Sequence, residues 1–188
     1  MDWYNFLIPL IGALVGGLFT LVSASYSFYK LRSHSLDIEK RQVENFVKSI
    51  RVELNVLFDQ YMGSMGTAVE NLQQDQKLDL YYPLTQDYFI VYHNNSRLIG
   101  SIEDSYVRNQ IIRIYTVAKG LVDSFRMNNE ILSNYEHECI LLNRDRDNNE
   151  STNSILVAYE DSLKAYAISI KQSHSEFKQQ LEILNDVI

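Results

Sequence analysis

The chain has 188 residues, a formal net charge of −7 and a single cysteine, Cys139. Because an acidic chain lacks the clustered Lys and Arg that neutralise phosphates, we expect no direct binding to nucleic acid. One thiol cannot close an internal disulfide, and no second cysteine completes a zinc-type spacing, so neither a disulfide scaffold nor a Cys-based metal site is expected. Only two prolines among many Leu, Ile, Glu, Gln and Lys residues indicate a helical chain.

Residues 3–29 contain no charged side chain, and Lys30 and Arg32 follow directly. About 20 apolar residues in a helix cross a bilayer, so we predict a transmembrane helix over residues 6–29 after a short external N-terminus, residues 1–5. A signal peptide is disfavoured because the start, "MDWYN", has no basic residue, although residues 23–25 resemble a cleavage region. Lys and Arg remain on the cytoplasmic side, so residues 30–188 are predicted to form a cytoplasmic domain.

Small residues recur every four positions within the predicted span: Gly12, Gly16, Thr20 and Ala24. This spacing places them on one stripe of a helix, where two backbones can approach closely. The stripe predicts self-association of the chain through the membrane. The alternative is that glycine is simply frequent in membrane helices.

An amphipathic helix is predicted after the span, because apolar residues continue at alternating steps of four and three: Val43, Val47, Ile50, Leu54, Leu57 and Tyr61. It is expected to be continuous with the span or to follow it closely. A coiled coil stays open, since the clean pattern lasts fewer than three heptads. Gly63 and Gly66 predict a kink or an end of this helix.

The aromatic residues of the chain concentrate in "LDLYYPLTQDYFIVYHNNSRLIG", residues 78–100. Pro83 and the "HNNS" stretch favour a small hairpin or an extended loop packed on helices. Large aromatic side chains either cover a core or form a recognition surface for a partner protein. The candidate partner surface comprises Tyr81, Tyr82, Tyr88, Phe89 and Tyr92.

Two further amphipathic helices are predicted. "SIED" opens the first, with Ser101 as N-cap and Asp104 three residues later, and its apolar face runs to Leu142. "NRDRDNNEST" ends it, and the last helix keeps the four–three rhythm to Ile188, through Tyr159, Leu163, Tyr166, Ile170, Ser173, Phe177, Leu181 and Leu184. Such helices bury their apolar stripes against each other or against a partner, and an antiparallel bundle is the simplest arrangement. The expected fold class is therefore all-α: a transmembrane helix and an antiparallel bundle with a small extended or hairpin insertion.

No motif in the sequence specifies chemistry, so we expect no catalytic residue, metal or cofactor. Asp145, Asp147 and Asn149 alternate as in a calcium loop, but Glu150 stands where that loop needs glycine and Leu156 where it needs glutamate. His137 and Cys139 are two residues apart and point in different directions on a helix. An enzyme remains the least favoured class; it would depend on His93, His137 or Cys139 meeting in three dimensions.

Two stretches carry a resemblance to known proteins: "IGALVGGLFTLVS" with its basic stop and "IRVELN", and the aromatic–Asn–Gly turn that leads into "AKGLVDSF". The chain resembles a loose group of small bacterial membrane proteins of prophages and anti-phage defence loci. Some proteins of this sort act as membrane effectors beside a cytoplasmic sensor, including reverse-transcriptase-based systems. The resemblance implies a location in the bacterial inner membrane and such a role.

The expected function is that of a non-enzymatic membrane effector in bacterial antiviral defence. It would form a homo-oligomer and bind a cytoplasmic protein partner, for which a defence-system sensor is one candidate. The alternative is a passive anchor or scaffold that holds a cytoplasmic partner at the membrane. In the first hypothesis the span itself perturbs the membrane, whereas in the second it only anchors the chain.

Overall fold

The computed structural model describes the backbone of residues 4–84, 87–144 and 149–188. Side chains are described in the same ranges except for residues 4–11, 13–15, 144 and 149–152. All regular elements in these ranges are helical, with no strand, which confirms the all-α class. The chain divides into two compact units, residues 1–45 and 46–188.

Helix α1, Tyr4–Tyr61, contains most of the first unit and continues into the second. The helix predicted after the uncharged run is therefore continuous with it. In the part of the chain that the structure describes, no helix is both long enough and apolar enough to cross a membrane. The side chains of residues 6–11 and 13–15, which belong to the predicted span, lie outside the described ones.

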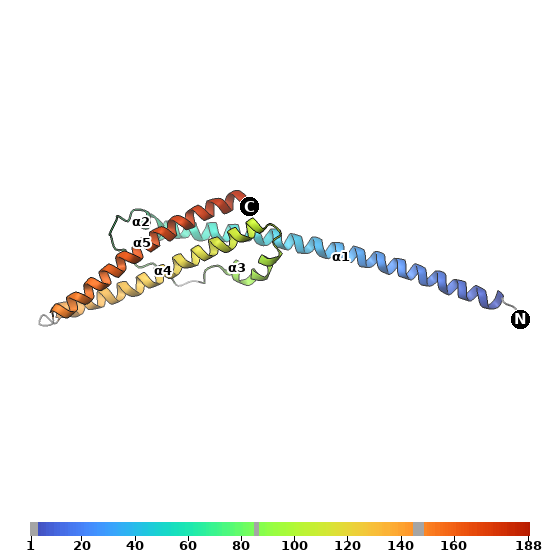
Figure 1. Ribbon diagram of the computed structural model, residues 1–188, viewed down its shortest axis with the longest axis horizontal. Coiled ribbons are helices and arrows are strands. Elements are labelled where there is room, and N and C mark those ends of the chain that lie inside the picture. The colour runs from blue at the N-terminus through green and yellow to red at the C-terminus, as the bar shows by residue number, and fades with distance from the viewer. Residues whose placement is uncertain (1–3, 85–86, 145–148) are drawn as a thin grey trace. The chain divides into compact units, whose positions relative to one another are not determined.

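The second unit is a helical bundle. Figure 1 shows α4, Ser105–Arg144, and α5, Asn149–Val187, side by side and running in opposite directions. Residues 46–61 of α1 add a third helix through aromatic contacts with both, such as the edge-to-face pairs of Phe58 with Phe177 and of Tyr61 with Phe125. All three helices contribute fully buried side chains, among them Ile50, Leu54, Ile111, Ile114, Leu163, Ile170 and Leu184.

The end of α1 matches the predicted kink or end at the two glycines. A π-helical turn, η1, covers Met62–Gly66, and a single α-helical turn, α2, covers Thr67–Glu70. A Cβ atom at Gly66 would overlap the sulfur of Met62, so a larger residue here would require the Met62 side chain to move. The widened turn leads the chain out of α1 toward α5, which α2 contacts.

The predicted hairpin near residues 78–100 is wrong, whereas the extended alternative holds for the first half. Residues 78–84 and 87–88 form neither helix nor strand, and α3, Ile90–Asn95, and the 3₁₀-helix η2, Ser96–Ser101, follow Phe89. Phe89 adopts a left-handed conformation, with φ of 69°, directly before α3. After this bend, residues 90–92 form a helical turn, although their sequence, "IVY", is typical of a strand. Tertiary contacts of Val91 and Tyr92 stabilise the turn.

The start of α4 lies later than predicted. Ser101 ends η2, and the first turn of α4 is capped by Asp104, whose Oδ1 accepts hydrogen bonds from the amides of Tyr106 (2.8 Å) and Val107 (3.3 Å). Two amides that would lack helical partners are thereby satisfied. The N-cap is therefore Asp104 rather than Ser101.

Candidate functional site

The five aromatic residues of the predicted partner surface differ in exposure. Tyr82 and Phe89 are core residues, only 8% and 6% exposed, because their rings pack against Phe125 and Tyr115 of α4. Tyr88 and Tyr92 are half-buried. Tyr81 remains 47% exposed. Tyr81 is therefore the exposed member of the predicted surface, and Tyr88 and Tyr92 are accessible only in part. Partner binding at these residues stays a prediction.

The extended segment over residues 77–84, called the strap below, is fastened to α4 by two neighbouring asparagines. The amide of Asn129 binds both polar main-chain groups of Tyr82: its Oδ1 accepts from the Tyr82 N–H (3.2 Å) and its Nδ2 donates to the Tyr82 carbonyl (2.7 Å). Nδ2 of Asn128 donates to the Leu78 carbonyl (3.1 Å). Leu78 is buried like Tyr82. The strap is therefore anchored by two side chains and recognised through its backbone.

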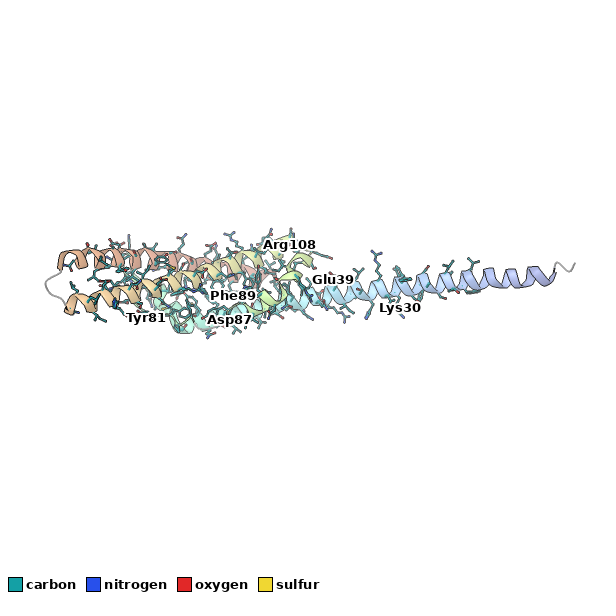
Figure 2. The ribbon with its side chains drawn as sticks, turned by 90° about the horizontal axis from the view of Figure 1, so that it is seen from below. Lys30, Glu39, Tyr81, Asp87, Phe89 and Arg108 are labelled. Atoms are coloured by element: carbon teal, nitrogen blue, oxygen red, sulfur yellow. The ribbon has the colours of Figure 1, made fainter. Side chains whose placement is uncertain are left out.

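Exposed contacts lie along the outer edge of the strap. The Tyr81 hydroxyl donates to Oε2 of Glu136 (2.8 Å), and Nζ of Lys77 lies 4.2 Å from the centre of the Tyr135 ring. Figure 2 labels Tyr81, Asp87 and Phe89 along the part of the chain that lies against the bundle. These edge contacts are solvent-accessible and add less than the buried anchors.

Glu53 of α1 organises the turn after the strap. Its carboxylate accepts hydrogen bonds from the amides of Val91 (2.7 Å) and Tyr92 (3.4 Å) in the first turn of α3, and from the Tyr115 hydroxyl (2.6 Å). A carboxylate at a helix N-terminus satisfies amides that have no helical acceptor. Burial, then the hydrogen bond to Glu53, raises the pKa of the Tyr115 hydroxyl, which keeps it a donor.

His174 of α5 is the centre of a second polar cluster. It is 3% exposed, with Nδ1 2.8 Å from the Tyr61 hydroxyl and Nε2 3.4 Å from Oε1 of Glu70, which also accepts from Nζ of Lys178 (2.8 Å). Burial lowers the pKa of His174 against the opposing influence of Glu70. A neutral ring fits both contacts, because one nitrogen accepts from Tyr61 while the other donates to Glu70.

An open depression of about 390 Å³ borders this cluster, lined by Glu70, Lys171, His174, Ser175, Lys178, Gln179 and Glu182. Both ring nitrogens of His174 already have partners, and Glu70 pairs with Lys178. The cluster therefore connects α1, α2 and α5 and presents no free base to the depression. Among the described residues, no group of His, Cys, Asp and Glu is arranged to hold a metal ion.

Comparisons with known proteins give no relative. No protein-family model matches the chain, and neither a curated protein nor a solved structure matches it.

The remaining candidates of the sequence stay apart. His93 lies on α3, while His137 and Cys139 lie on α4, where His137 is exposed and Cys139 half-buried. The calcium-like acidic stretch falls on residues 145–150, whose side chains lie outside the described ones. The predicted apolar stripe of the last helix includes Ser173 and leaves out the buried residue beside it, His174. The spacing of Ile170, His174, Phe177 and Leu181 is the sequence signal that identifies the buried position.

The small-residue stripe is uncovered in the first unit. Gly12, Gly16, Thr20 and Ala24 are exposed, and a Cβ atom added at either glycine would meet no other atom within 4 Å. The Thr20 hydroxyl donates to the Gly16 carbonyl (2.8 Å), so its polar group is satisfied inside the helix. A larger side chain at these glycines would therefore meet no other atom of the described residues.

Proposed function

We propose that the chain is a single-pass protein of a bacterial inner membrane. Residues 6–29 cross the bilayer, residues 1–5 lie outside and the helical domain, residues 30–188, lies in the cytoplasm. The uncharged run within α1 carries this proposal: its described apolar side chains are exposed, among them Leu18, Phe19, Leu21, Val22 and Phe28. Exposed apolar surface of this extent favours contact with lipid or with another chain.

The proposed activity is that of a non-enzymatic effector in antiviral defence. A cytoplasmic event clusters or releases the helical domain, the spans associate along the small-residue stripe, and the associated spans perturb the membrane. The spacing of Gly12 and Gly16 supports the association step, because glycines four residues apart let two helix backbones approach closely. The role in defence rests on the resemblance to proteins of anti-phage loci.

The stripe can be tested by replacing Gly12 and Gly16 with Ile in the full chain. We expect both oligomerisation in detergent and membrane depolarisation after induction in a bacterial host to be lost, because bulky side chains separate the backbones. Gly17→Ile is the matched control. Gly17 lies one residue from the stripe, and its Cβ would also meet nothing within 4 Å.

Equal effects of the stripe variant and of Gly17→Ile would contradict stripe-specific packing. If neither the intact chain nor the variants depolarise the membrane, an unrelated membrane span should be exchanged for residues 1–29. Full function of that chimera would establish the passive anchor, in which the span only holds a cytoplasmic partner at the membrane.

A further inference from the structure

Among the described residues, the main chain of the strap is bound by side chains of the bundle. No backbone–backbone hydrogen bond engages residues 77–84 in the described part of the chain. Asn129 instead satisfies the N–H and the carbonyl of Tyr82, and Asn128 binds the Leu78 carbonyl. Main-chain recognition of this kind accepts any extended segment, while pockets for alternate side chains select among them. The two pockets here hold Leu78 and Tyr82.

The strap does not complete the site that it occupies. Asn128 is fully buried, and its Oδ1 has no hydrogen-bond partner among the described residues. Because the Nδ2 of the same amide contacts the Leu78 carbonyl, this free acceptor lies beside the bound backbone. A buried acceptor without a donor costs free energy that a better-fitting ligand recovers.

We propose that the face of α4 that carries Asn128 and Asn129 is a docking groove for an extended segment of a partner protein. The strap occupies this groove when the partner is not bound. The partner segment carries a leucine-like and an aromatic side chain four residues apart. It offers the main-chain N–H and carbonyl at the aromatic residue, as Tyr82 does. It also supplies one further N–H that reaches Oδ1 of Asn128.

A second copy of the chain is the weaker occupant of this groove. Its strap makes the same contacts as the resident one, yet it lacks the high effective concentration of a tethered segment. A foreign segment gains over the strap by pairing Asn128. The proposal depends only on contacts within residues 46–188 and goes beyond the proposed membrane function, so either can fail without the other.

The test is peptide binding to the full chain in mild detergent, with fluorescence anisotropy as the readout. The probe is a labelled peptide of residues 77–84, KLDLYYPL. Tyr82→Ala releases the resident strap from its aromatic pocket, so we expect this variant to bind the probe at least ~10-fold more tightly than the wild type. Adding Asn129→Ala to that variant should abolish the gain. N-methylation of the peptide at the nitrogen of its Tyr82 should do the same.

Leu80→Ala is the matched control, because Leu80 lies on the strap but is exposed, and it should bind like the wild type. Circular dichroism verifies folding. If Tyr82→Ala loses helix content, Tyr81→Phe replaces it, since this change removes the exposed hydroxyl that contacts Glu136 and Ser133; a smaller gain, still sensitive to Asn129→Ala, is then expected.

A folded strap variant that binds no more tightly than the wild type would overturn the groove. So would binding that survives Asn129→Ala. Sedimentation of the chain without peptide tests the other occupant. Wild-type dimers that disappear in Asn129→Ala would assign the groove to a second copy and overturn the foreign partner.

Discussion

Glu53 and Glu70 are two carboxylates that hold different segments to the bundle in different ways. Glu53 accepts hydrogen bonds from a tyrosine hydroxyl and from two amides at the start of α3, all of them neutral donors. Glu70 accepts hydrogen bonds from Lys178 and from the ring of His174, and the other nitrogen of that ring contacts the Tyr61 hydroxyl. Glu53 is half-buried, whereas Glu70 is exposed.

This difference shows where each segment gets its stability. An exposed ion pair contributes little, because water and salt screen it. The buried contact between Tyr61 and His174 joins α1 to α5, and the exposed pair of Glu70 and Lys178 adds little to the attachment of α2. The attachment of α3 includes a contact between the rings of Tyr92 and Tyr115, but its first amides depend on Glu53 as their acceptor.

Glu53→Ala is expected to have the largest effect. It leaves the Tyr115 hydroxyl and two amides of α3 without their acceptor, so we expect a loss of about 3 kcal/mol in the free energy of unfolding. Urea denaturation followed by circular dichroism measures it, and faster amide exchange at residues 90–95 locates it. Glu53→Gln should lose less, since the amide oxygen still accepts one of the bonds.

Glu44→Ala is the matched control, because Glu44 is exposed on the same helix. A loss in Glu53→Ala no larger than in this control would show that α3 is held by its apolar contacts. The two carboxylates would then not differ in the way described.

His174→Leu is expected to have a smaller effect, about 1–2 kcal/mol, because it leaves only one buried donor, the Tyr61 hydroxyl, without a partner. Combining it with Tyr61→Phe removes that donor. We expect the double variant to be more stable than the sum of the two single losses predicts, and urea denaturation of the full cycle measures this coupling. Strictly additive losses would mean that the contact between Tyr61 and His174 contributes no stability.

The helices were predictable from the sequence because their periodicity is local. The apolar stripes of α1, α4 and α5 repeat at helical spacing, and burial of Ile50, Leu54, Leu163 and Ile170 follows them. The predicted stripe of the last helix includes Ser173 instead of its buried neighbour His174, because histidine does not count as an apolar residue. Only its pairing with Tyr61, which is 113 residues away in the chain, makes it a core residue.

The segment between α2 and α4 was not predictable in the same way, because distant residues determine its structure. "DYFIVY" has the composition of a strand, but Glu53 and Tyr115 fix Val91 and Tyr92 in a helical turn. Asn128 and Asn129 fix the strap, and nothing in their local sequence distinguishes them from exposed helix residues. The aromatic cluster was found from composition, but its division into buried and exposed members depends on these tertiary contacts.

The smallest expected effect is a pH dependence that only the His174 cluster should produce. Burial lowers the pKa of His174 below its ordinary value of 6.5, with Glu70 acting against this shift and Lys178 and Lys171 acting with it. The unfolded chain therefore binds more protons than the folded one below about pH 6.5, so stability present above that value is lost as the pH falls. The lowered pKa of Glu70 acts in the same direction, but only near and below its ordinary value of 4.5.

Unfolding in urea at about pH 7 and about pH 5 separates the contribution of His174 from that of Glu70. We expect the wild type to lose stability over this interval and His174→Leu to lose less, while Glu53→Gln retains the wild-type slope. An unchanged slope in His174→Leu would assign the acid sensitivity to other groups.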